Sequence, residues 1–255
     1  MLDRVLLLVE GEKTEYNFLE RLLSFNCKDI TTEVIPIGIN IYTFYKKIQF
    51  LGEDSTTTLD TLKEIKKNNV KDLEQIEKGF AYIYLVFDFD MQESGLKTED
   101  KLTVLGEMMK TFANETGDFG QLLIDYPMVE SYRDFKKDFP KDFLSNERNV
   151  PVDKLTSYKN IVDERGNDLD IKKYKAKSFD LITKLNIMKA FQIVKKEINF
   201  DSFIQPDFLL NILESEIDNY QRKSGFIIPL CEMTFFLIFL YGKETFDSII
   251  NSKIY

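Results

Sequence analysis

The sequence predicts an α/β fold in which a parallel sheet flanked by helices precedes a mostly helical C-terminal half. Two unbroken apolar runs, residues 4–9 and 82–87, support the sheet, because such runs are typical of strands buried on both faces. Helical periodicity separates the two runs and returns from Ser178 onward. We expect an α/β domain over residues 1–135 and a mainly helical region, residues 136–255, packed on it.

The remaining elements follow from periodicity and turn residues. Thr14 is expected to cap a helix whose inner face carries Phe18 and Leu22. Residues 40–79 are expected to form a helical crossover or insertion, with a polar loop at residues 54–58. The other expected elements are a strand at 32–37, a helix at 98–112, a turn at 117–120, a strand at 121–125, and helices from 178, at 208–217 and after Pro229.

The chain has no histidine, which excludes Ser-His-Asp, Cys-His and histidine-ligated zinc chemistry. Any metal must therefore be held by oxygen. Its two cysteines, Cys27 and Cys231, indicate neither a zinc cluster nor a disulfide framework, which fits a reducing cytoplasm. Residues 1–10 hold too short an apolar run for a signal peptide. The apolar residues 226–241, interrupted by Pro229, are expected to form a buried core helix and not a membrane span.

The charge is acidic overall but uneven along the chain. Lys and Arg number 34 against 43 Asp and Glu, a net charge of −9, so general attraction to nucleic acid is not expected. Residues 131–177 differ, because twelve basic and nine acidic side chains give them a local charge of +3. A local basic patch is compatible with this distribution.

Three carboxylates lie where predicted central strands end. Glu10 follows the first apolar run, and Asp88 and Asp90 follow the second. The carboxyl ends of strands are where open α/β sheets hold ligands. If the backbone stays extended through Phe89, a period of two puts both aspartates on one side. Like charges held that close raise one another's pKa unless a cation compensates, so we expect a divalent ion here.

A strand followed by Glu10-Gly11 and, about 75 residues later, a strand followed by Asp88-Phe89-Asp90 resembles the Toprim domain of topoisomerases, primases and related nucleases. The segment from Glu10 to Leu19 looks most like the OLD-type and RloB-like Toprim nucleases, which are associated with bacterial defence against phage. Pro127-Met128-Val129-Glu130 is similar to a Pro-x-x-Glu segment of that group. The resemblance covers residues 1 to about 135.

This resemblance implies a Toprim-like sheet and an endonuclease dependent on Mg²⁺ or Mn²⁺ that hydrolyses phosphodiester bonds in DNA or RNA, tRNA included. The implied metal ligands are Glu10, Asp88, Asp90 and Glu130, and carboxylate oxygens suit the hard Mg²⁺ ion. Glu10 could instead accept a proton from the attacking water.

The resemblance also implies a catalytic lysine and a protein partner. Lys175 and Lys177, just before Ser178, the expected N-cap of a helix, are the nearest equivalents of the lysine that stabilises charge at the phosphate, and Lys159 is the alternative. OLD-like nucleases often accompany an ABC-type ATPase. No Gly-x-x-x-x-Gly-Lys-[Ser/Thr] P-loop occurs in these residues, so a separately encoded ATPase is expected. No membrane partner is expected, and a homo-oligomer stays open because composition does not fix the number of subunits.

Each of these motifs also has a plainer interpretation. Asp88 and Asp90 could simply end a strand and cap the next element. Glu130 could be an ordinary surface glutamate, and Glu12 and Glu15 are expected to be solvated charges in the first turn of a helix.

Two other functions compete with the nuclease. The first is a regulated, non-catalytic subunit that binds a partner. The second is a glycosyltransferase in which Asp88-x-Asp90 binds a sugar nucleotide, although Glu10-Gly11 would then have no role. A haloacid dehalogenase-type phosphatase is disfavoured, because Gln92 stands where that pattern needs Thr or Val.

Overall fold

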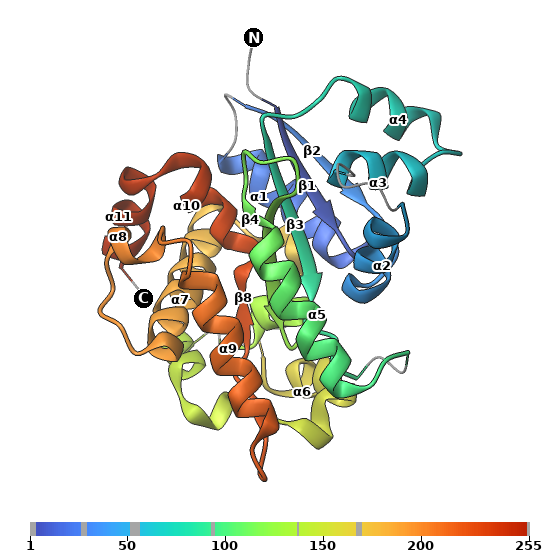
Figure 1. Cartoon of the computed structure of the whole chain (residues 1–255). Coiled ribbons are helices and arrows are strands. Elements are labelled where there is room, and N and C mark those ends of the chain that lie inside the picture. The colour runs from blue at the N-terminus through green and yellow to red at the C-terminus, as the bar shows by residue number, and fades with distance from the viewer. Residues whose placement is uncertain are drawn as a thin grey trace. The chain divides into compact units, whose positions relative to one another are not determined.

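The computed structural model describes residues 4–26, 30–51, 57–92, 95–136, 138–166 and 170–253 (Figure 1). Cys27 and most of the polar loop expected at residues 54–58 lie outside these ranges. Among the described residues, no helix is both long enough and apolar enough to cross a membrane.

The chain divides into two compact units. The first unit is formed by residues 1–88 and 97–123, and the second unit by residues 89–96 and 124–255. The chain therefore passes from one unit to the other after Asp88, after Leu96 and after Leu123. The domain boundary expected at residue 135 stays a prediction.

A mostly parallel sheet organises the first unit. β1 (Arg4–Val9) pairs in parallel with β2 (Thr31–Pro36) on one side and with β3 (Tyr82–Asp88) on the other. Residues 5–9 of β1 are fully buried, which explains why this strand is apolar on both faces. β5 (Gly120–Tyr126) follows β3 in the strand order. The α/β class and the parallel pairing predicted from the sequence are confirmed.

The start of β5 is packed tightly against the start of β3. Gly120 has φ 83, and a Cβ atom at this position would lie 2.7 Å from the carbonyl oxygen of Ile83. Both the left-handed backbone and the close approach require glycine. The short strand β4 (Ala113–Asn114) pairs antiparallel with this end of β5.

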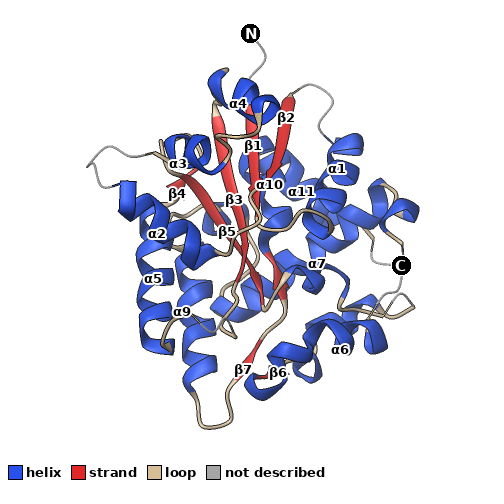
Figure 2. Cartoon of the chain, turned by 90° about the vertical axis from the view of Figure 1, so that its right-hand side faces the viewer, coloured by secondary structure: helices blue, strands red, loops and turns tan. Residues whose placement is uncertain are grey.

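Helices lie on both sides of these strands, α1 on one side and α2 and α5 on the other (Figure 2). Phe44 of α2 contacts Phe87 of β3, with ring centroids 5.4 Å apart. The helical interpretation of residues 40–79 is confirmed for the described part of that range. The helices of the first unit are α1 (Thr14–Asn26), α2 (Ile41–Leu51), α3 (Thr58–Ile65), α4 (Val70–Glu77) and α5 (Thr98–Thr111).

The second unit is mainly helical and has an aromatic core. Phe203 lies at its centre, with ring centroids 5.2 Å from both Phe208 and Phe235. Its helices are α6 (Tyr158–Arg165), α7 (Ala176–Val194), α8 (Phe200–Phe203), α9 (Phe208–Gln221), α10 (Phe236–Tyr241) and α11 (Lys243–Asn251). Its 3₁₀ helices are η1 (Val129–Arg133), η2 (Pro140–Leu144), η3 (Asn146–Arg148), η4 (Val152–Ser157), η5 (Ile171–Lys173) and η6 (Glu232–Phe235).

The expectation that residues 226–241 form one helix is wrong in its first half. β7 (Phe226–Ile227) pairs with β6 (Val150–Pro151), and β8 (Leu230–Cys231) pairs antiparallel with the end of β5. An unpaired strand edge leaves backbone groups unsatisfied, so β8 covers the edge of β5 before the helix begins. The expected burial of this segment is confirmed.

A buried charge network ties the loops of the second unit together. Asp134 is fully buried and accepts hydrogen bonds from Arg148 at 2.8 Å, from Arg165 at 2.7 and 3.0 Å, and from the Tyr158 hydroxyl at 3.0 Å. Arg148 also pairs with Asp142. Two guanidinium groups thus face two carboxylates, which balances the charge.

Candidate functional site

Glu10 and Asp88 lie at the ends of neighbouring parallel strands in the first unit. The register pairs Val9 of β1 with Val86 of β3, so the carboxyl ends of these two strands lie side by side. The backbone N–H of Asp88 donates a hydrogen bond to Oε2 of Glu10 at 3.3 Å. The backbone of Glu10 is also fixed, because its N–H donates to Val86 and its carbonyl accepts from Gly38. The structure therefore brings these two predicted residues together.

The turn after Glu10 depends on Gly11 and Glu15. Oε1 of Glu15 accepts the N–H of Gly11 at 3.1 Å, and a Cβ atom on Gly11 would lie 2.5 Å from Oε2 of Glu15. Glu15 is only 6% exposed, so the expectation that it is a solvated charge is wrong. Its carboxylate caps the turn at the N-terminus of α1, where a helix favours negative charge. Glu12 is exposed, as expected.

Asp90 follows a change in backbone direction. β3 ends at Asp88, and Asp90 has φ 44, so the extended backbone does not reach Asp90. Phe89, between the two aspartates, is fully buried in the second unit and donates its N–H to the carbonyl of Asp125 at 3.0 Å. The alternation that would put both aspartates on one side therefore stops at Asp88.

Glu130 is buried in the second unit and forms an ion pair. It is 5% exposed, lies in η1, and its Oε1 is 3.2 Å from Nζ of Lys159. The interpretation of Glu130 as an ordinary surface residue is therefore wrong. Lys159, the alternative catalytic lysine, is thus engaged with one of the predicted metal ligands.

Lys175 and Lys177 flank the start of α7 and are both exposed. The backbone N–H of Lys175 donates to the hydroxyl of Ser178 at 3.2 Å, so Ser178 lies in the first turn of α7 and does not form its N-cap. The side chains of both lysines can reach a ligand from solvent, and their catalytic role stays a prediction.

The residue types suit a hard metal ion, because both residues carry carboxylates and the Asp88 backbone lies within hydrogen-bond distance of the Glu10 carboxylate. Within the described ranges, no group of three or more Asp, Glu or Cys side chains is close enough to hold a metal ion. Glu10 and Asp88 therefore form the part of the predicted ligand set that the first unit assembles, and the roles of Asp90 and Glu130 rest on the sequence motif.

Sequence reasoning missed a set of buried ionisable groups in the second unit. Glu216 of α9 and Glu232 of η6 are fully buried, and burial raises the pKa of Glu216 to about 8 and that of Glu232 well above its usual range. Each accepts one backbone N–H, from Ile228 at 3.0 Å and from Ile124 at 2.8 Å. Burial lowers the pKa of Lys189 to about 8. No local sequence pattern distinguishes these glutamates from exposed ones.

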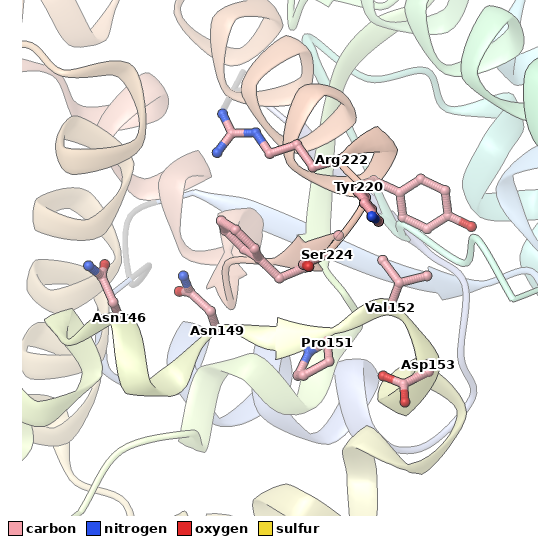
Figure 3. Close-up of a pocket in the computed structure, with 11 residues that line it drawn as sticks. Asn146, Asn149, Pro151, Val152, Asp153, Tyr220, Arg222 and Ser224 are labelled. Carbon is pink, nitrogen blue, oxygen red and sulfur yellow. The ribbon is translucent and has the colours of Figure 1, made fainter.

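A cavity of about 720 Å³ also lies in the second unit (Figure 3). One wall is formed by residues of η3, β6 and η4, and the other by the turn between α9 and β7. The residues that define these walls are Asn146, Asn149, Val152, Tyr220, Arg222 and Phe226. The signal in the sequence was the polar turn Arg222-Lys223-Ser224-Gly225 between two aromatic residues.

Comparison with known protein families, with curated proteins and with solved structures finds no match to this chain. The resemblance to the Toprim nucleases therefore rests on Glu10-Gly11, Asp88-Phe89-Asp90 and the segment ending at Glu130.

Proposed function

We propose that this chain is a metal-dependent nuclease of the Toprim type, similar to the OLD-type and RloB-like enzymes, that hydrolyses phosphodiester bonds of DNA or RNA. The observation that carries the proposal is the hydrogen bond from the Asp88 N–H to the Glu10 carboxylate. It joins two acidic motifs that are 78 residues apart in sequence at one edge of a parallel sheet. This is the edge at which α/β sheets bind ligands.

The proposed ligands are Glu10 and Asp88 in the first unit, with Asp90 and Glu130 added by the motif. When bound, Mg²⁺ or Mn²⁺ supplies positive charge that offsets the phosphate and makes water a better nucleophile near neutral pH. Glu10 is held in place by Asp88 and by its own backbone hydrogen bonds, so its carboxylate is preorganised. Such a fixed carboxylate serves either as a ligand or as an acceptor for the proton of the attacking water.

The remaining roles belong to lysines and to a partner. Lys175 or Lys177 would stabilise negative charge at the phosphate, since both are exposed cations. The resemblance further implies a role in defence against phage together with an ATPase. These 255 residues contain no P-loop, so that ATPase would be supplied by residues outside this sequence.

Cleavage of labelled single- and double-stranded DNA and RNA with Mg²⁺ or Mn²⁺ tests the proposal. We expect Glu10→Ala and Asp88→Ala to reduce cleavage by more than about 100-fold, because even residues one step removed from a metal cost roughly 10–100-fold. Glu12→Ala is the matched control, since Glu12 is an exposed acid two residues from Glu10. Circular dichroism should show that all variants keep their helices, and full cleavage by both the Glu10 and the Asp88 variant would refute the proposal.

A further inference from the structure

We propose that the cavity between Asn149 and Arg222 holds one unstacked nucleotide of a single-stranded nucleic acid, with its phosphate on Arg222. This inference rests on the proposed nuclease function and assigns where the strand is held. The whole cavity belongs to the second unit. None of its residues is among the predicted metal ligands.

The size and lining of the cavity suit a nucleotide. Its volume of about 720 Å³ lies within the range of pockets that bind small organic ligands. Tyr220 and Phe226 supply aromatic surface, and nucleic acid bases stack on aromatic side chains regardless of sequence. Val152 adds apolar surface on the opposite wall.

The charge of the cavity favours an anion although the chain is acidic. Arg222 and Lys223 are both exposed cations, and among the lining residues only Asp153 is acidic, so the lining carries a charge of +1. The guanidinium of Arg222 lies 5.9 Å from the ring centroid of Phe226, a cation–π contact. A guanidinium held on an aromatic ring can still present its planar fork to a phosphate.

Two side-chain amides lie on the wall opposite Arg222. Asn146 and Asn149 rise from the same side of the ribbon (Figure 3). Each amide has donors and an acceptor, as the edges of bases require. Oδ1 of Asn149 is shielded from solvent and has no hydrogen-bond partner among the described residues. Asn146 is exposed, so its amide can donate to and accept from the edge of a base.

The two walls are fastened to each other, so the cavity is preformed. The N–H of Val152 donates to the carbonyl of Gly225 at 3.0 Å, and β6 pairs with β7. A Cβ atom on Gly225 would lie 2.3 Å from the carbonyl oxygen of Tyr220, so this turn has no room for a larger residue. A preformed site loses little conformational entropy on binding.

The cavity wall also contacts Phe89, within the second unit. The ring of Tyr220 meets that of Phe89 edge-on, with centroids 6.4 Å apart. Phe89 is the residue between Asp88 and Asp90. A nucleotide beside Tyr220 would thus contact the same packed aromatic group that fixes the backbone next to Asp90.

Fluorescence anisotropy with labelled strands tests this inference without cleavage. Full-length protein is titrated in EDTA with a short single-stranded RNA, the same sequence as DNA, and the matched duplex. We expect the wild-type chain to bind a single strand more tightly than the duplex, and the RNA and DNA arms identify the substrate. Arg222→Ala should weaken binding by roughly tenfold or more, because it removes a charge-assisted contact.

The other variants distinguish binding in the cavity from a general effect of net charge on binding. Ser224→Glu places a negative charge on an exposed lining residue and should weaken binding as Arg222→Ala does. Lys196→Ala changes the net charge by the same amount at an exposed position outside the lining and should bind as the wild type. Equal binding by all variants, equal affinity for the duplex, or no binding by the wild type would overturn the inference.

The experiments distinguish failure of the nucleotide-binding proposal from failure of the nuclease proposal. Metal-dependent cleavage with unchanged binding by the Arg222 and Ser224 variants would refute nucleotide binding in the cavity and leave the proposed nuclease activity supported. Binding that depends on Arg222, without cleavage in the presence of either metal, would support nucleotide binding in the cavity and refute the proposed nuclease activity.

Discussion

Glu216 allows a quantitative test of how a buried carboxyl group makes the stability of this protein depend on pH. Its side chain lies on α9, is fully buried, and accepts the N–H of Ile228 through Oε2, while Oε1 has no hydrogen-bond partner among the described residues. Desolvation raises the pKa of Glu216 to about 8 in the folded protein, although the Ile228 N–H and the charge of Lys189 oppose the shift. Glu216→Gln keeps the shape and the acceptor but cannot ionise.

The sign and size of the effect follow from the two pKa values. Between the ordinary value of 4.5 and the folded value of about 8, the folded protein retains a proton that the unfolded chain has released. The free energy of unfolding therefore falls as pH rises through this window. A difference of about 3.5 units corresponds to at most about 5 kcal/mol. Glu216→Gln should match the wild type near pH 5 and be more stable by several kcal/mol above about pH 8.

Urea unfolding followed by far-ultraviolet circular dichroism at about pH 5, about pH 7 and about pH 9 measures this difference. Glu214→Gln is the control, because Glu214 is an exposed glutamate on the same helix. Lys189 and Glu232 are present in all three proteins, so their titrations affect each profile. If the wild type and Glu216→Gln lose stability with pH in parallel, Glu216 is not protonated in the folded protein and the reasoning fails.

Two further predictions concern stability. Asp134→Asn should lower the free energy of unfolding by about 3–5 kcal/mol, because it removes the fully buried carboxylate that the guanidinium groups of Arg148 and Arg165 share. Asp163→Asn should cost less than about 1 kcal/mol, because the Asp163 side chain is 54% exposed. Similar losses for the two variants in chemical denaturation would contradict this. Gly120→Ala should lower the melting temperature by several degrees, because its Cβ would meet the Ile83 carbonyl at a left-handed backbone position, and an unchanged melting curve would refute the close packing of β3 and β5.

The sequence predicted the central strands well because their signal is local. Residues 4–9 form an unbroken apolar run, and β1 has the same limits, since a strand with helices on both faces has no polar side. The pairing of β8 could not be predicted in this way. Asp125 and Cys231 are more than a hundred residues apart, and a two-residue strand is too short to show any periodicity.

In the candidate site, too, some contacts could be predicted from the sequence and others could not. The approach of Glu10 to Asp88 follows from parallel pairing alone, which is why motif order was sufficient to predict it. The burial of Glu15 depends on the turn at Gly11, and the ion pair of Glu130 depends on Lys159 in a distant helix. Such contacts are set by tertiary packing, which the order of residues does not reveal.

Phe89 gives a physical reason for the aromatic residue between the two aspartates. It is fully buried, packs on Tyr126 with ring centroids 5.1 Å apart, and meets Tyr220 edge-on. Asp88 is fixed separately, because its N–H is bound to Glu10 in the first unit. The motif therefore places each aspartate through a different anchor: a hydrogen bond to the Glu10 carboxylate for Asp88, and an aromatic core for the residue before Asp90. Loss of the aromatic ring at position 89 should thus affect Asp90 and the Tyr220 wall together while the Glu10–Asp88 contact persists.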